Sequence, residues 1–235
     1  MTGADGGARV TLEEVSAGYP GRRVLRQLTA RIPALASTAI VGANGSGKST
    51  LLGVVAGVIP LTAGRVGTGP GRRPAFVTQR SAVADTLPLT VRETVAMGRW
   101  GHLGLLGRLS AHDREVVDAS MERLGIGGLA GRRLGELSGG QRQRALVAQG
   151  LAQEADLLLL DEPATALDPA ARERIAEVLE EVTAQGITVV QATHDLRAAR
   201  RADHCLLLWE GRLLREGPPG DVLTDELFQQ AWQPH

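Results

Sequence analysis

Residues 36–56 read ASTAIVGANGSGKSTLLGVVA, in which a short apolar run, a glycine-rich turn and an apolar segment follow one another. Residues 42–49 of this stretch match the pattern G-x-x-x-x-G-K-[ST] in full. The sequence predicts a buried strand over Thr38–Val41 and a helix over Ser49–Ala56, which is the context that the pattern requires. Backbone N–H groups of such a turn, together with the helix N-terminus, bind phosphate oxygens. The stretch therefore predicts an α/β domain with a phosphate-binding loop.

The lysine of this loop is the only lysine in the chain, because all the other basic residues are arginines. A compact ammonium is not freely replaced by a guanidinium at a phosphate site, so Lys48 indicates a chemical requirement. We expect Lys48 to reach the β- and γ-phosphates of a nucleotide, and the Ser49 hydroxyl to bind Mg²⁺. The predicted contacts of the loop with the nucleotide are Gly42, Asn44, Gly45, Ser46, Gly47, Lys48, Ser49 and Thr50.

The composition of the 235-residue chain is that of a globular protein, with 43% hydrophobic and 22% charged residues. Basic and acidic residues both number 26, so no net charge attracts nucleic acid, and we expect no such partner. The single cysteine, Cys205, excludes a disulfide framework and a zinc site built from cysteines. The uncharged runs 32–47 and 49–64 are too short and too rich in Gly, Ser and Thr to span a membrane. We therefore expect a soluble chain in the cytoplasm.

Strand and helix patterns alternate along the chain, and the central strands are continuous apolar runs, which predicts a mainly parallel sheet. The expected class is an α/β P-loop NTPase core with an N-terminal antiparallel β portion. Residues 1–9 are interpreted as a flexible tail and 10–235 as a single domain. The region from about 87 to 134 has helical patterns and no convincing strand, so we interpret it as a helical subdomain inserted into the core.

Individual elements follow from apolar periodicity and capping residues. The first strand pattern is followed by a turn over 16–23, and the helical region contains a glycine-rich connection over 98–109. The expected strands are 10–15, 38–41, 64–66, 75–78, 157–160, 187–192 and 205–209, and the expected helices are 49–56, 90–97, 110–124, 141–152, 168–184 and 195–202.

Two adjacent carboxylates follow the four leucines of 157–160. Ligands of parallel sheets bind at the carboxyl ends of the strands, so this position suits a catalytic site. We expect Asp161 to hold the Mg²⁺ shell and Glu162 to polarise a water molecule against the γ-phosphate. The alternative, an acidic loop at the end of a strand, is less favourable in a chain that also carries a complete phosphate loop.

A second glycine turn, Leu137-Ser-Gly-Gly-Gln141, precedes a helix and contains no lysine of its own. With this third motif, the chain resembles the ATP-binding subunits of ABC transporters from about Val10 to Trp232. In that family the signature turn of one subunit covers the nucleotide that is bound to the phosphate loop of another. The resemblance therefore implies a head-to-tail homodimer that encloses two ATP molecules with Mg²⁺, and it assigns nucleotide contacts to Ser138, Gly139, Gly140 and Gln141.

Four further positions are carried over from this resemblance. Tyr19 matches the aromatic residue that stacks on adenine, and Gln79 matches the glutamine that contacts Mg²⁺ and senses the transmembrane partner. The family often has Pro before this glutamine, where this chain has Thr78. Asp168, in the segment Thr165-Ala-Leu-Asp168, matches an aspartate at the dimer interface and also reads as a helix N-cap. His194 matches the histidine that touches the γ-phosphate.

The resemblance also implies partners outside this chain. Because no span is visible, the permease must be a separate polypeptide, which would place this chain at the cytoplasmic face of the membrane. An extracytoplasmic solute-binding protein would complete an importer. Gln79, Trp100 and the segment Leu103–Leu106 of the helical subdomain are expected to face the permease, although the apolar residues could equally be subdomain core.

The cargo is suggested by family likeness alone. Residues 97–115 and 132–149 are similar to the corresponding stretches of zinc/manganese-type metal ABC ATPases. Iron-chelate or haem import is the alternative within transport. An iron–sulfur assembly ATPase or a division-linked ATPase is the alternative outside it.

Overall fold

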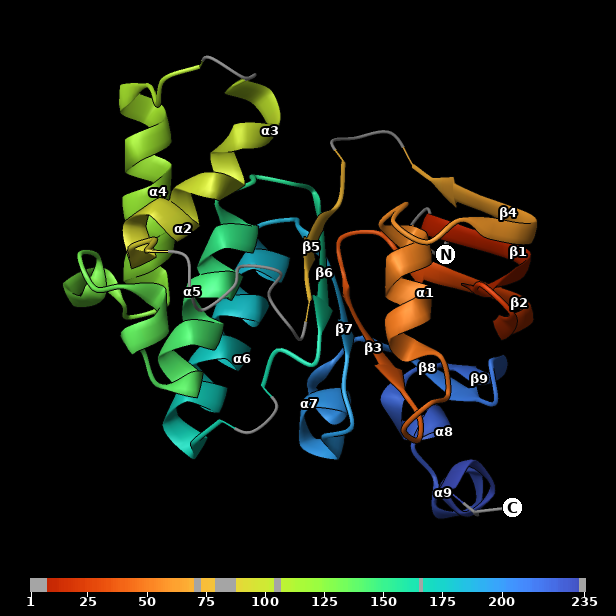
Figure 1. Ribbon diagram of the computed structural model, residues 1–235. Coiled ribbons are helices and arrows are strands. Elements are labelled where there is room, and N and C mark those ends of the chain that lie inside the picture. Colours follow the sequence, from red (N-terminus) through yellow and green to blue (C-terminus); the bar gives the residue numbers. More distant parts are fainter. Residues whose placement is uncertain (1–7, 70–72, 79–87, 104–106, 165–166, 233–235) are drawn as a thin grey trace, which may run out of the picture.

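The computed structural model describes residues 8–69, 73–78, 88–103, 107–164 and 167–232 (Figure 1). It contains a three-stranded antiparallel sheet in the order β2-β1-β4 and a six-stranded sheet in the order β5-β6-β7-β3-β8-β9. Every pairing in the larger sheet is parallel except that of β8 with β9. The strands are β1 Ala8–Tyr19, β2 Arg22–Pro33, β3 Ser37–Val41, β4 Leu61–Thr68, β5 Ala75–Val77, β6 Leu157–Asp161, β7 Thr188–Ala192, β8 His204–Trp209 and β9 Arg212–Gly217.

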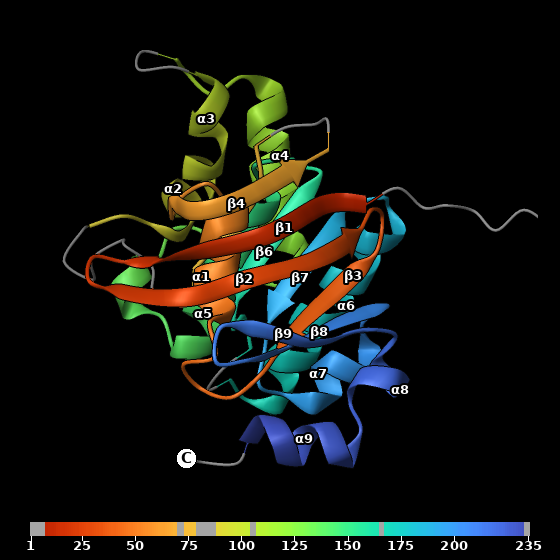
Figure 2. The same cartoon turned by 90° about the vertical axis from the view of Figure 1, so that its right-hand side faces the viewer.

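Helix α1 (Lys48–Val55) lies between the two sheets, with the antiparallel sheet on one side and the large sheet on the other (Figures 1 and 2). One apolar core joins α1 to both sheets; it contains Leu12, Leu28, Ile40, Leu51 and Leu159, all at most 1% exposed. The expected α/β class, with its antiparallel N-terminal portion and mainly parallel sheet, is confirmed.

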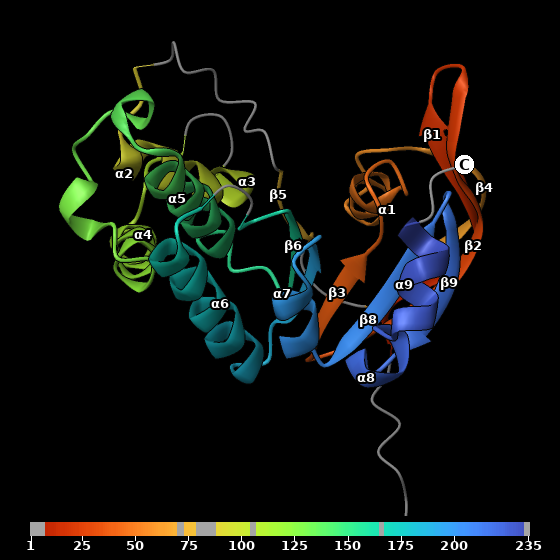
Figure 3. The same cartoon turned by 90° about the horizontal axis from the view of Figure 1, so that it is seen from below.

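The helical insert forms a second body of packed helices, on the side of the large sheet opposite α1 (Figure 3). Its described residues contain no strand, and a single isolated bridge joins Thr90 to Arg133. Its apolar core includes Val95, Met121 and Leu134 and continues into the helices that follow it. The helices of the insert are α2 Val91–Ala96, η1 Met97–Arg99, α3 Trp100–Leu103, α4 Ala111–Arg123 and η2 Gly127–Leu129, and those that follow it are η3 Leu134–Glu136, α5 Gly139–Leu151 and α6 Pro169–Ala184.

Three short helices complete the described chain: α7 Leu196–Arg201, α8 Pro219–Val222 and α9 Asp225–Trp232. They cover the β8 side of the large sheet with a separate small core around Val41, Ala199 and Cys205. Burial raises the pKa of the Cys205 thiol to about 12, so this thiol is uncharged at neutral pH. Among the described residues, no helix has both the length and the apolar character that crossing a membrane would require.

The turn predicted over 16–23 is wrong, because β1 continues to Tyr19 and only two residues separate it from β2. The strand β2 was not predicted, since its exposed positions are mainly arginines that obscure the alternation of buried residues. Strand β1 also begins at Ala8, so Arg9 belongs to the sheet; its guanidinium donates to Gly69 O at 2.6 Å and to Asp156 Oδ1 at 2.9 Å.

The connection predicted over 98–109 is also partly wrong, because η1 and α3 carry helical structure on to Leu103. Close packing explains its glycine: a Cβ on Gly98 would lie 2.4 Å from the carbonyl oxygen of Gln149 in α5. Arg99 then holds this segment in place. Its side chain is 3% exposed, and it donates to Asp113 Oδ1 at 2.8 Å and to Ala152 O at 2.7 Å.

The buried ion pair between Arg99 and Asp113 leads to a prediction about stability. Asp113 also accepts hydrogen bonds from the N–H and hydroxyl of Ser110, which caps α4. We expect Asp113→Ala to lower the free energy of unfolding by about 3 kcal/mol, because a buried arginine loses its buried carboxylate partner and keeps only the more exposed Glu154, also at 2.8 Å. The matched control is Asp118→Ala, which removes the partner of Arg92 from a half-exposed pair and should cost less than about 1 kcal/mol. Urea unfolding of both variants measures the difference, and equal losses would contradict this interpretation.

Candidate functional site

The phosphate loop connects β3 to α1 and is shaped by glycines that no other residue could replace without strain. Gly47, at the N-terminus of α1, has φ of 107°, in the left-handed region. A Cβ at this position would lie 2.9 Å from Leu25 Cδ2 of β2. The loop is therefore in close contact with the antiparallel sheet, and Gly42, Gly45 and Gly47 line the pocket described below.

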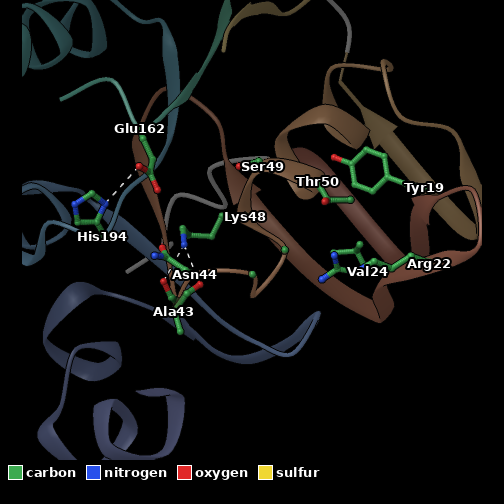
Figure 4. Close-up of a pocket in the computed structure, with 13 residues that line it drawn as sticks. Tyr19, Arg22, Val24, Ala43, Asn44, Lys48, Ser49, Thr50, Glu162 and His194 are labelled. Carbon is green, nitrogen blue, oxygen red and sulfur yellow. Dashed lines mark hydrogen bonds and ion pairs between the residues drawn. The ribbon is translucent and has the colours of Figure 1, made fainter. Parts of the chain in front are cut away.

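Lys48 is buried at the base of this loop, with 5% of its surface exposed. Its ammonium group donates to Gly42 O at 2.9 Å and to Ala43 O at 3.1 Å (Figure 4). Burial lowers the pKa of Lys48, and the nearby carboxylates of Glu162 and Asp161 oppose this shift. The geometry places a cation inside the loop, where the loop carbonyl groups orient it.

The side chains of Ser49 and Asp161 meet, as expected for two ligands of one metal ion. Ser49 Oγ donates to Asp161 Oδ1 at 2.9 Å, although 111 residues separate them in the chain. Burial raises the pKa of Asp161, partly offset by the hydrogen bond from Ser49. A hydroxyl and a carboxylate are hard oxygen donors of the kind that Mg²⁺ prefers, so these two residues fit the ion.

Glu162 and His194 approach each other from neighbouring strands. Strands β6 and β7 are paired in parallel, so the residues that follow them emerge at the same edge of the sheet. Glu162 Oε2 lies 3.5 Å from His194 Nδ1 (Figure 4). Glu162 has φ of 49°, a backbone conformation that costs energy and is commonly found at functional sites.

Lys48, Ser49, Glu162 and His194 line a single pocket of about 910 Å³, and Asp161 is joined to it through its hydrogen bond with Ser49. Tyr19 lies at one side, where its ring is 53% exposed, and Glu162 with His194 lies at the other (Figure 4). Arg22 and Val24 also line the pocket, and no sequence motif predicted them. The signal that could have identified them is the hairpin register, which pairs Tyr19 with Arg22 and so puts their side chains on one face.

The second glycine turn lies elsewhere. Helix α5, which Ser138 caps, lies on the opposite side of the large sheet from α1 (Figure 3). Ser138 Oγ accepts a hydrogen bond from the N–H of Gln141 at 3.3 Å, and Gln141 Oε1 accepts one from the N–H of Ser138 at 3.1 Å. None of the described residues that line the pocket belongs to this turn. Gly139 and Gly140 form the first turn of α5.

Asp168 is close to this second turn rather than to the phosphate loop. Its Oδ1 accepts a hydrogen bond from the N–H of Ala171 at 2.9 Å, so the predicted N-cap of α6 is confirmed. A Cβ on Gly140 would lie 3.4 Å from Asp168 Oδ2, which shows that α5 and α6 begin side by side. Gln79 and the Thr165–Ala166 part of the predicted interface segment lie outside the described residues.

Comparison with known proteins agrees with this arrangement. Residues 25–165 match the family described as ABC transporter. A relative from Chlamydia trachomatis, described as "Probable metal transport system ATP-binding protein", is 38% identical over 94% of this chain and 88% of its own. The zinc transport system ATP-binding protein TroB of Treponema pallidum is 35% identical over 95% and 86%. The ferric enterobactin transport ATP-binding protein FepC of Escherichia coli is 37% identical over 96% and 87%.

A solved structure of a metal-chelate type ABC transporter in an inward-facing conformation superposes with a TM-score of 0.86 at 30% identity. The match covers 96% of this chain and 89% of that one. The residues that match the family, 25–165, include the phosphate loop, the helical insert and the carboxylates at the end of β6. The chain therefore belongs to the ATP-binding subunits of ABC transporters, the ATPases that hydrolyse ATP to drive transport.

Proposed function

We propose that the pocket between Tyr19 and His194 is the ATP site of a metal importer's ATPase. The observation that carries this proposal is the convergence of Lys48, Ser49 and Glu162 in one pocket, with Asp161 hydrogen-bonded to Ser49. The base of ATP would stack on Tyr19 and its β- and γ-phosphates would lie in the loop with Lys48. Ser49 and Asp161 would hold Mg²⁺, with Gln79 as a further ligand; the ion would offset the charge of the phosphates.

Glu162 is the group placed to act as general base. Its carboxylate is at the strand edge beside the phosphate loop, so it can orient a water molecule toward the γ-phosphate and accept its proton. His194 lies 3.5 Å from this carboxylate, and its half-exposed ring can contact the γ-phosphate from the same edge. Lys48 and the loop N–H groups would stabilise the charge that develops on the transferred phosphoryl group.

The separation of the two glycine turns supports a head-to-tail homodimer. A partner subunit would place its Ser138, Gly139, Gly140 and Gln141 over the phosphate loop of this chain, with Asp168 nearby at the interface. The N-terminus of the 13-residue helix α5 provides backbone N–H groups and a partial positive charge toward an anion. Hydrolysis would remove the γ-phosphate that both subunits contact, and so open the dimer.

The helical insert supplies the proposed contact with a separate transmembrane permease. Trp100 is 58% exposed on α3, an unusual exposure for a large apolar side chain. The residues before and after it, Arg99 and Gly101, line a groove of about 1130 Å³ together with Arg73 and Glu154. The predicted segment 104–106 lies outside the described residues. This contact would hold the chain at the cytoplasmic face of the membrane.

The proposed cargo is a transition metal such as zinc or manganese, delivered by an extracytoplasmic solute-binding protein. Relatives named for zinc and for general metal transport support this cargo. Iron-chelate import is the second candidate, because the ferric enterobactin relative is 37% identical and the superposed transporter is of a metal-chelate type.

The catalytic assignment predicts that Glu162→Gln still binds ATP but hydrolyses it about 10²–10⁴ times more slowly, because the general base is lost. With Mg-ATP, this variant should run as a dimer on a sizing column while the wild type runs mainly as a monomer. Adding Ser138→Arg, which blocks the contact across the interface, should abolish the dimer. Wild-type hydrolysis by Glu162→Gln would refute the role of Glu162, and a dimer of the double variant would refute the head-to-tail arrangement.

The proposed contact between the helical insert and the permease can be tested by crosslinking. In a Cys205→Ser background, Trp100→Cys in the assembled transporter should crosslink to a cysteine in a cytoplasmic loop of the permease, because the side chain projects from the insert. Leu35→Cys is the matched control, since Leu35 is an exposed apolar residue outside the insert. Equal crosslinking of the two positions, or crosslinks within this chain only, would argue against docking at the insert.

The cargo is tested by growth. Cells that lack this chain should grow poorly when zinc and manganese are chelated, and an excess of one of these metals should restore growth. The Glu162→Gln allele serves as the control that should fail to complement, because it makes the protein without its activity. Rescue by an iron chelate, and not by zinc or manganese, would favour the second candidate.

A further inference from the structure

We propose that Arg22 binds the α-phosphate of ATP and forms a second cationic contact of the nucleotide site. This inference rests on the proposed location of ATP in the pocket between Tyr19 and the phosphate loop. It adds a residue that belongs to none of the three sequence motifs.

The hairpin register determines which way Arg22 faces. Tyr19 pairs directly with Arg22, and Gly18 pairs with Arg23, across a turn of two residues. Residues that are directly opposite in an antiparallel pair project from the same face, and successive residues alternate. Arg22 therefore shares the face of the Tyr19 ring, and Arg23 projects from the other. The pocket agrees, because Arg22 and Val24 line it and Arg23 does not.

The distance between Arg22 and the phosphate loop is also constrained. A Cβ on Gly47 would lie 3.4 Å from Val24 Cγ1, so the loop is in direct contact with β2 two residues after Arg22. Two residues of strand span about 6.6 Å, a distance that an extended arginine side chain can cover. In Figure 4, Tyr19, Arg22 and Val24 face the phosphate loop from one side of the pocket.

The charges favour a phosphate as the ligand of Arg22. Arg22 and Lys48 are the arginine and the lysine among the described residues that line the pocket. Lys48 is directed into the loop by Gly42 O and Ala43 O, where the β- and γ-phosphates are expected. If the base stacks on Tyr19, the α-phosphate is the anionic group that lies between the base and the β- and γ-phosphates. Arg22 is exposed and has no ion-pair partner in the described part of the chain, so its guanidinium is available.

Binding of ATP and ADP to the full-length chain, measured by calorimetry, tests this proposal. Arg22→Ala should lower the affinities for ATP and ADP by the same factor, about five- to tenfold, because both nucleotides contain the α-phosphate. Arg22→Lys should recover part of the affinity, and the difference between wild type and Arg22→Ala should shrink as NaCl is raised from 50 to 500 mM.

Arg23→Ala is the matched control, since it removes an equal charge from the other face of the same strand; it should leave both affinities within twofold of the wild type. Unchanged affinity of Arg22→Ala, or an equal loss in Arg23→Ala, would overturn the proposal. A loss for ATP that is absent for GTP would indicate contact with the base and would overturn it as well. Lys48→Ala separates the two hypotheses: if it leaves ATP binding intact, the proposed site itself is wrong, whatever Arg22 does.

Discussion

The contact of the phosphate loop with the antiparallel sheet is the constraint on which the geometry of the site depends. Gly47 touches Leu25, and a Cβ on Gly211 would lie 1.7 Å from the carbonyl oxygen of Val24, so only glycine fits at either position. Hydrogen bonds complete the junction: Arg26 N donates to Gly211 O at 2.9 Å, and Gly211 N donates to Ser46 O at 3.0 Å. Two sheets and one loop thereby share a backbone junction, which holds Tyr19 and Lys48 in the same pocket.

Parallel strand order brings the other chemical groups to this junction. Strands β6, β7 and β3 are neighbours, and their carboxyl ends carry the acidic pair, the histidine segment and the phosphate loop. The hydrogen bond between Ser49 and Asp161 and the contact between Glu162 and His194 are direct results of that order. A different strand order would leave the same residues at distant edges, and no motif by itself specifies the order.

The second glycine turn, in contrast, lies away from the phosphate loop. It begins a helix on the far side of the large sheet, close to Asp168 at the start of α6. One subunit therefore presents two separate faces that can each donate to an anion: the pocket with the phosphate loop and Lys48, and the neighbouring N-termini of α5 and α6. Two copies in head-to-tail orientation would unite these faces, which is the physical basis of the proposed dimer.

The sequence by itself determined the phosphate loop, the buried strand with its terminal carboxylates and the capped helices, because each depends on neighbouring residues. The N-caps at Thr90, Ser110 and Asp168 were visible for this reason. Tertiary structure decided what depends on distant contacts. The strand β2 is specified by pairing with β1, the helical turns after Met97 by the buried Arg99, and the position of Arg22 by the hairpin register. In these segments the local pattern is weak, and the free energy that selects the conformation comes from partners elsewhere in the chain.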